Sequence, residues 1–61
     1  MDHNFVLFVN DNGFIDNDGH FVNNVTKARI FVSREMAEKH RSMIYSQHHG
    51  FSNTISILEW L

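Results

Sequence analysis

The sequence predicts an α+β fold: a small antiparallel sheet in the order β-β-β-α-β, with one helix packed on one face. Short runs of Val, Ile and Phe are separated by clusters of Asn, Asp and Gly, a pattern typical of strands joined by tight turns. One longer stretch with helical periodicity, which follows Ser33, separates the first three runs from the last. A chain of 61 residues is expected to form one compact domain, which we assign to residues 1–61.

The first strand is predicted over Phe5–Val9, a continuous apolar run. Because successive side chains of a strand point to opposite faces, Val6 and Phe8 share one face and the other three residues share the opposite one. Both faces are apolar, which is typical of a strand that is covered on both sides.

Two clusters of turn-forming residues follow, at Asp11–Gly13 and Asp16–Gly19. Asn, Asp and Gly tolerate the left-handed backbone that tight hairpin turns require. Short strands at Phe14–Ile15 and His20–Val22 then complete a meander. We expect the two turns to gather their Asn and Asp side chains on one edge of the sheet.

The segment Val25–Val32 is ambiguous. Thr26 can cap a single helical turn, or Ile30–Val32 can form a short strand. We favour the turn, with Ala28 and Phe31 packed inward.

The helix is predicted to begin after Ser33, whose hydroxyl can accept from backbone N–H groups of the first turn, and to end before Gly50. Glu35 in the first turn and His48–His49 near the end favour the helix dipole. Helical periodicity predicts an inward side made of Met36, Ala37, His40, Met43, Ile44 and Gln47. The opposite side is predicted to face solvent and carries Glu38, Lys39, Arg41, Ser42 and Tyr45.

The last strand is predicted over Ile55–Leu61. Ile55 and Ile57 alternate with polar residues, as in a half-buried strand, but Leu58 and Trp60 lie on the opposite face. Either a bulge changes the phase of the strand, or its end is apolar on both sides.

Composition excludes several classes of site. The chain has no Cys, which excludes disulfides and thiolate zinc sites. Its net charge of −2 argues against binding to nucleic acid, yet all five Lys and Arg residues lie between Lys27 and Arg41, so a basic nucleic-acid-binding surface at 27–41 is the alternative. No apolar run is long enough to span a membrane, and we expect a protein of the cytoplasm.

The stretch Asn10–His20 raises the question of a calcium loop. Such a loop needs oxygen ligands at positions 1, 3 and 5, Gly at position 6 and Glu at position 12. With Gly19 at position 6, Phe14 falls on position 1 and Val25 on position 12, so two ligands are missing. We therefore favour hairpin turns over a weak, irregular cation site.

We predict no metal site at the histidines, no cofactor and no enzymatic activity. His40 and His48 are about two helical turns, or ~12 Å, apart, which is too far for them to share one ion. His40 is expected to be a hydrogen-bonded core residue. The chain contains no Gly-rich phosphate loop and no recognisable nucleophile motif.

The second apolar face of the sheet is the most informative feature. Either Phe8, Leu58 and Trp60 fold over one another or under the Phe14–Phe31 region, or a partner covers them. A homodimer through this face would stabilise so small a domain. Because Tyr, Trp and Arg dominate interface energies and acidic side chains can meet a basic surface, the predicted partner-binding residues are Tyr45, Arg41, Trp60, Leu58, Asp11, Asp16 and Asp18.

The stretch Lys27–Glu38 adds a resemblance. It resembles a pattern found in small open reading frames of tailed bacteriophages, in which a hairpin with Asn-Gly turns leads into a helix start. The matching residues are Lys27, Ala28, Phe31, Ser33, Glu35, Ala37 and Glu38. The resemblance covers roughly residues 5–40 and transfers no catalytic residue. It implies an accessory protein that inhibits a host enzyme or a host defence system.

These observations lead to one functional hypothesis and its alternative. The chain is expected to be a small interaction protein that binds a host protein in the host cytoplasm. The alternative is a nucleic-acid-binding module that uses the basic segment 27–41.

Overall fold

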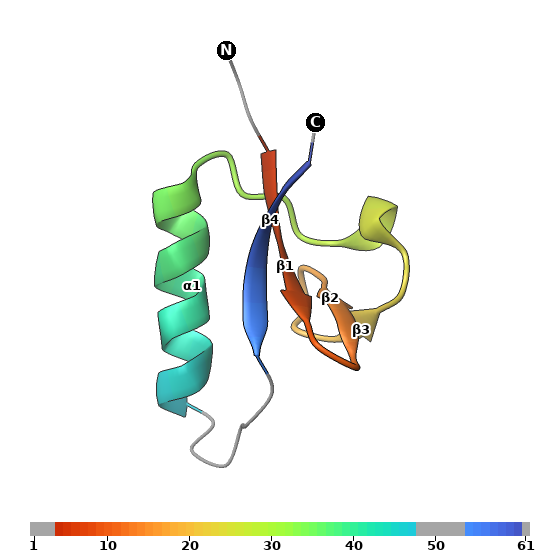
Figure 1. The fold of residues 1–61 in the computed structure, drawn as a ribbon, viewed down its shortest axis with the longest axis horizontal. Helices are drawn as coiled ribbons and strands as arrows, with labels where there is room; N and C mark the ends of the chain where they lie inside the picture. The colour runs from red at the N-terminus through yellow and green to blue at the C-terminus, as the bar shows by residue number, and fades with distance from the viewer. Residues whose placement is uncertain (1–3, 48–53, 61) are drawn as a thin grey trace.

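The computed structural model describes residues 4–47 and 54–60. It contains one helix beside a four-stranded antiparallel sheet (Figure 1), so the predicted α+β fold is confirmed. The elements in chain order are β1 (Asn4–Val9), β2 (Gly13–Ile15), β3 (Phe21–Val22), the 3-10 turn η1 (Val25–Lys27), α1 (Arg34–Gln47) and β4 (Ile55–Trp60). The expected helix end at residues 48–50 lies outside the described residues.

The sheet has the order β3-β2-β1-β4, so the first and last strands are neighbours. Their antiparallel register runs without interruption from the pair Asn4–Trp60 to the pair Val9–Ile55. No bulge therefore interrupts β4 between Ile55 and Trp60. Ile55 and Ile57 lie on one side of the strand, with Glu59, and Leu58 and Trp60 lie on the other.

Both hairpin turns form where the sequence predicts them. Asp11 and Gly13 have φ angles of 69° and 105°, and Gly19 has φ 82°, so each turn uses the left-handed backbone. At Gly13 a Cβ atom would lie 2.5 Å from the carbonyl oxygen of Val22, so only glycine fits there. The expectation of one shared acidic edge is wrong, because successive turns of a meander lie at opposite ends of β2.

The ambiguous segment contains both a turn and a bridge to β1. Asn24 caps η1, since its side chain accepts from the backbone N–H of Thr26 at 3.0 Å, so the predicted cap at Thr26 is wrong. Phe31 then pairs with Phe5 through two backbone hydrogen bonds of 2.8 and 2.9 Å. Ala28 and Phe31 are buried, as predicted.

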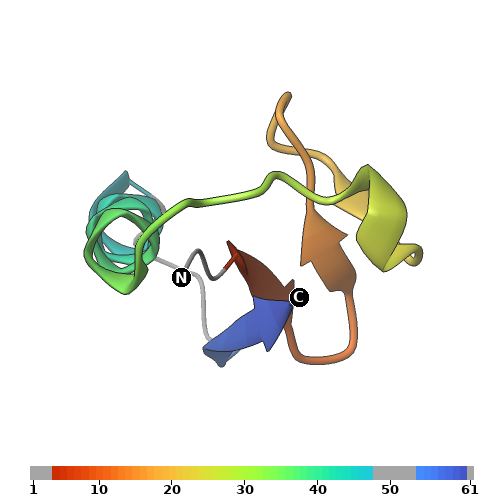
Figure 2. The same cartoon turned by 90° about the horizontal axis from the view of Figure 1, so that it is seen from above.

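The core lies between the sheet and α1. Figure 2 shows α1 on one side of the β1–β4 pair, with η1 and β3 toward the opposite side. The chain crosses between these sides just before α1. The core consists of Leu7, Val9, Ile15, Phe31, Ala37 and Ile55, with Phe5, Ile44 and Ile57 packed against it.

The helix starts as expected, and the side that faces the sheet matches the predicted one in part. Ser33 Oγ accepts from the backbone N–H of Met36 at 3.2 Å, which confirms the predicted cap. Ala37 is buried and Ile44 packs on the core, but Met36 and Met43 are 50% and 45% exposed. The predicted inward position of the two methionines, and of the exposed Gln47, is therefore wrong.

The core assignment predicts unequal effects of two leucine truncations. Leu7→Ala should lower the free energy of unfolding by ~2–5 kcal/mol, because it leaves a cavity among fully buried side chains. Leu58→Ala should cost well under half of that, since Leu58 is 41% exposed. Urea denaturation followed by circular dichroism measures both, and equal losses would contradict the assignment.

Candidate functional site

The face of the sheet opposite α1 carries a continuous set of apolar residues, which we name the open face. Residues paired across antiparallel strands point to the same side, and the register aligns Val6 with Leu58, Phe8 with Phe14, and Phe14 with Val22. Asn4 pairs with Trp60 on the same side. The open face consists of Val6, Phe8, Phe14, Val22, Leu58 and Trp60.

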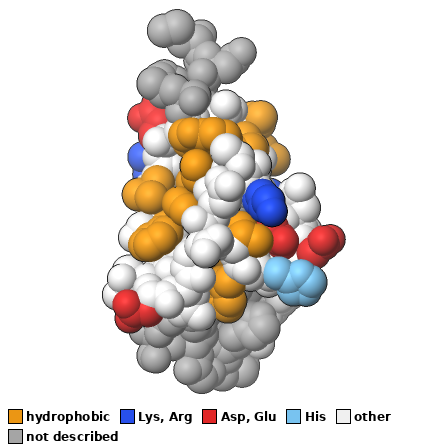
Figure 3. Space-filling view, turned by 90° about the vertical axis from the view of Figure 1, so that its right-hand side faces the viewer, with side chains coloured by type: hydrophobic (Ala, Val, Ile, Leu, Met, Phe, Trp, Pro, Cys, Tyr) orange, Lys and Arg blue, Asp and Glu red, His pale blue; other side chains and the backbone are white. Residues whose placement is uncertain are grey.

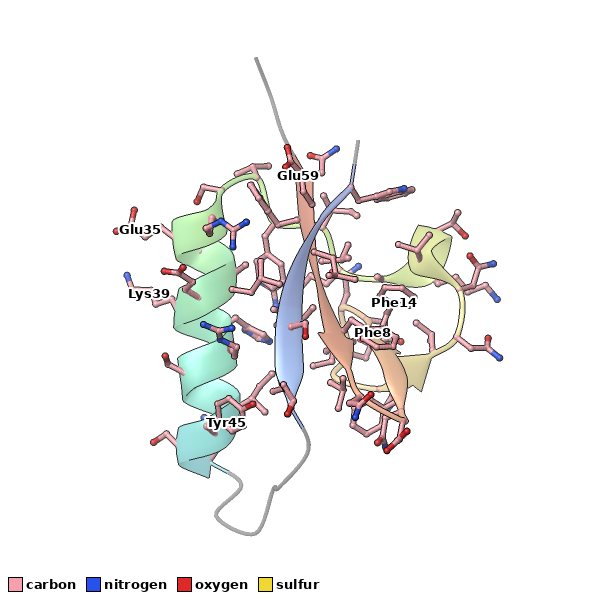
Figure 4. All side chains as sticks on the ribbon, in the orientation of Figure 1. Phe8, Phe14, Glu35, Lys39, Tyr45 and Glu59 are labelled. Atoms are coloured by element: carbon pink, nitrogen blue, oxygen red, sulfur yellow. The ribbon has the colours of Figure 1, made fainter. Side chains whose placement is uncertain are left out.

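The open face covers itself only in part. The rings of Phe8 and Phe14 meet edge to face, with centroids 5.1 Å apart (Figure 4), and Val6 is only 1% exposed. Leu58 is exposed, and Trp60, Phe8, Phe14 and Val22 are half-buried. Seen from the side of β3 and η1, hydrophobic side chains gather over the upper and central surface (Figure 3). Val6 is therefore covered, whereas an apolar surface remains at Leu58.

Two predicted partner-binding residues instead connect the helix to the edge of β4. Because the backbone N–H of Asn10 donates to the carbonyl of Thr54, at 2.9 Å, the strand alternation turns the backbone groups of Ile55 away from β1. The N–H of Ile55 donates to Tyr45 Oη at 2.9 Å, and Arg41 Nη1 makes a longer contact of 3.4 Å to the carbonyl oxygen. Tyr45 is still 40% exposed, as its predicted place on the solvent side of the helix requires, whereas Arg41 is half-buried. The contacts to Ile55 are what the sequence did not predict.

These contacts form because the backbone N–H and C=O groups on the outer edge of β4 need hydrogen-bond partners. A partly buried N–H or C=O that loses water must find another partner. Helical periodicity ranks Arg41 and Tyr45 as surface residues, because it records only their polarity. Their long side chains carry the groups that the backbone of Ile55 needs.

The acidic residues occupy two separate turns. Asp11 lies between β1 and β2, whereas Asp16 and Asp18 lie between β2 and β3. The backbone N–H of His20 donates to Asp16 Oδ1 at 2.8 Å, and this bond is the main cause that holds the pKa of Asp16 below its ordinary value of 3.8. Desolvation opposes this shift, and a bond of 2.9 Å from the N–H of Asp18 adds to it.

The same turn brings together the side chains of Asp16, Asp18 and His20, which the sequence analysis did not combine into one site. Asp16, Asp18 and His20 each offer one ligand atom, and these atoms lie within 4.8 Å of one another. The spacing i, i+2, i+4 is the sequence signal of this set. Hydrogen bonds within the turn already account for the position of Asp16, so the convergence alone does not establish a metal site.

The basic residues of segment 27–41 make different contacts. The Arg34 guanidinium lies 5.3 Å from the centre of the Phe5 ring, and Arg41 reaches the carbonyl oxygen of Ile55. Lys27 lies in η1. Arg29 and Lys39 both line a groove beside α1.

His40 lines the same groove and is half-buried, so the expected core position is only partly realised. Its ring lies 5.4 Å from that of Phe31. Desolvation lowers the pKa of His40 below the ordinary value of 6.5, and the positive charge of Arg29 lowers it further. The environment therefore favours a neutral imidazole.

Comparison with known proteins identifies no relative: no family model, no curated protein and no solved structure matches this chain. Within residues 4–47 and 54–60, no helix is long and apolar enough to cross a membrane. The function must therefore be inferred from the residues of the chain itself.

The contact between Tyr45 and β4 predicts a specific loss. Tyr45→Phe should lower the free energy of unfolding by ~0.5–1.5 kcal/mol and speed hydrogen exchange at the Ile55 amide, which loses its acceptor. Exchange followed by NMR measures this change. Ser42→Ala, at an exposed position on the same helix, is the control and should leave the Ile55 amide unchanged.

The environment of His40 predicts a pH-dependent stability. Above pH 6.5 both the folded and the unfolded chain hold a neutral imidazole at this position. As the pH falls through 6.5, the unfolded chain takes up the proton first, so stability declines until the folded form is also protonated. His40→Gln should flatten this decline, measured as the urea midpoint at successive pH values. The exposed His20→Gln is the control, and a decline that persists unchanged in His40→Gln would argue against this origin.

Proposed function

We propose that this chain is a small non-enzymatic binding protein whose open face docks onto a partner protein. The observation that supports the proposal is the apolar surface around Leu58 and Trp60, on the side of the sheet that α1 does not cover. Apolar surface of this kind marks sites of association when it is continuous and rimmed by polar groups. Burial of Leu58 and of the Trp60 ring would supply the hydrophobic centre of such an interface.

The partner we propose is a host protein, such as a defence enzyme or a nucleic-acid-processing enzyme, and the chain would act as its stoichiometric inhibitor. This part of the proposal rests on the resemblance to small bacteriophage proteins and on the lack of a recognisable catalytic motif. Asp11, Asp16 and Asp18 would contribute to the encounter with a basic target, because charges at the rim of an interface mainly raise the association rate.

Tyr45 and Arg41 have a different place in this proposal. Both side chains contact the backbone of Ile55, so their loss would disturb the seating of α1 on β4 before it affected an interface. Leu58 and Trp60 are the anchors that we assign to binding itself.

Substitution at Leu58 tests the proposal. Leu58→Asp should reduce partner binding by about ten-fold or more, because it places a carboxylate in the centre of the apolar surface. Binding is compared by quantitative capture from host lysate, and the fold is checked by circular dichroism. Phe21→Ser is the matched control: it removes an exposed apolar side chain from β3 that pairs with Ile15, on the side of the sheet away from the open face.

The two possible results separate clearly. Loss of one captured protein with Leu58→Asp but not with Phe21→Ser supports the open face as the interface. Equal capture by both variants and the native chain overturns it. Sedimentation of the native chain at increasing concentration tells whether a second copy of the protein is the partner, in which case Leu58→Asp should be monomeric.

A further inference from the structure

A second surface lies on the helix side of the molecule. A groove of about 280 Å³ separates α1 from the segment that leads into it, and it is lined by Arg29, Phe31, Met36, Lys39, His40 and Met43. This lining includes two cationic side chains, Arg29 and Lys39, beside the imidazole of His40, and no carboxylate, although the whole chain carries a net charge of −2. The charge of the groove is therefore opposite in sign to that of the protein.

The two methionines give this groove an apolar wall. Met36 and Met43 are about half exposed, and neither belongs to the hydrophobic core. An unbranched thioether side chain adapts its shape to an apolar ligand at little cost. The groove therefore offers contact area that the fold itself does not use.

The side chain and the backbone of Arg29, the cation at the end of the groove, both make contacts within the fold. The Arg29 guanidinium carbon lies 5.1 Å from the centre of the Phe31 ring, and the backbone N–H of Arg29 donates to the Ile15 carbonyl at 2.9 Å. The Phe31 ring in turn contacts His40. A guanidinium that is already oriented loses little entropy when it pairs with a carboxylate, and its planar fork matches the two oxygens.

We propose that this groove binds an acidic peptide segment of a partner protein, with carboxylates at Arg29 and Lys39 and one apolar side chain between Met36 and Met43. The volume supports a ligand of this size, because pockets for whole drug-sized molecules measure roughly 300–1,000 Å³. A single peptide side chain with flanking charges matches the smaller groove.

A nucleic acid fits the groove less well. Bases bind such surfaces by stacking on open aromatic faces, but the phenyl ring of Phe31 is only 4% exposed and lies beneath Arg29. Arg34 and Arg41, which a phosphate backbone would need, are directed to Phe5 and Ile55.

The inference is independent of the proposed function. The groove shares no residue with the open face, so Leu58→Asp should leave peptide binding unchanged even where it abolishes capture of a partner at the open face. Lys39 is exposed and is not part of the core, so it can be altered without disturbing core packing.

The test uses a fluorescein-labelled peptide, Glu-Asp-Leu-Asp-Glu, and the full chain. Anisotropy at low salt should show saturable binding, and Lys39→Glu should raise Kd by about ten-fold, because it places a like charge against the peptide. Met43→Ser should weaken binding several-fold by removing the apolar wall. The matched control is Lys27→Glu, which makes the same change of charge at an exposed position outside the groove and should leave Kd unchanged.

Three results would overturn the proposal. Equal weakening by Lys27→Glu and Lys39→Glu shows general charge attraction without a site. Equal affinity for a peptide with Ser in place of Leu shows that the apolar contact is absent. Binding of a ten-nucleotide poly-dT strand that Lys39→Glu weakens, without binding of the acidic peptide, identifies a nucleic-acid surface instead.

Discussion

The pairing of β1 with β4 is the interaction on which the rest of the structure depends. It aligns six residue pairs, from Asn4–Trp60 to Val9–Ile55, and joins the two ends of the described chain. Because both strands are apolar on both sides, their pairing creates two hydrophobic surfaces at once. Forming this pair closes a loop over most of the chain, which costs conformational entropy. Contacts between residues so far apart in the sequence are slow to form.

The two surfaces differ in how much of them is buried. On one side α1, the Phe31 bridge and β2 bury Leu7, Val9 and Ile55 almost completely. On the other side the edge-to-face contact of Phe8 with Phe14 closes part of the surface, and Leu58 remains exposed. One helix and two short strands are too little chain to cover both sides. A domain of this size therefore combines a dry core with an apolar exterior surface.

The sequence predicts the fold because its local signals agree with one another: Gly13 and Gly19 mark the hairpins, and Ser33 marks the helix start. The side of the helix that meets the sheet could not be predicted in the same way. Hydrophobic periodicity selects the methionines, whereas the edge of β4 requires the donor and acceptor groups of Arg41 and Tyr45. Strand alternation correctly predicts that Leu58 and Trp60 lie on the side of β4 opposite Ile55 and Ile57. The groove at Arg29 depends on the bridge between Phe5 and Phe31, and local sequence patterns carry no information on pairing between such distant residues.

The contact of Tyr45 with Ile55 has a consequence for the way the protein opens. Since β4 is an edge strand, the groups at Ile55 are shielded from other chains only while α1 stays in place. Undocking of the helix would uncover a strand edge and the buried apolar residues beside it in one event. Such an opening would present an unpaired strand edge together with apolar side chains, which is the combination that favours pairing with another chain.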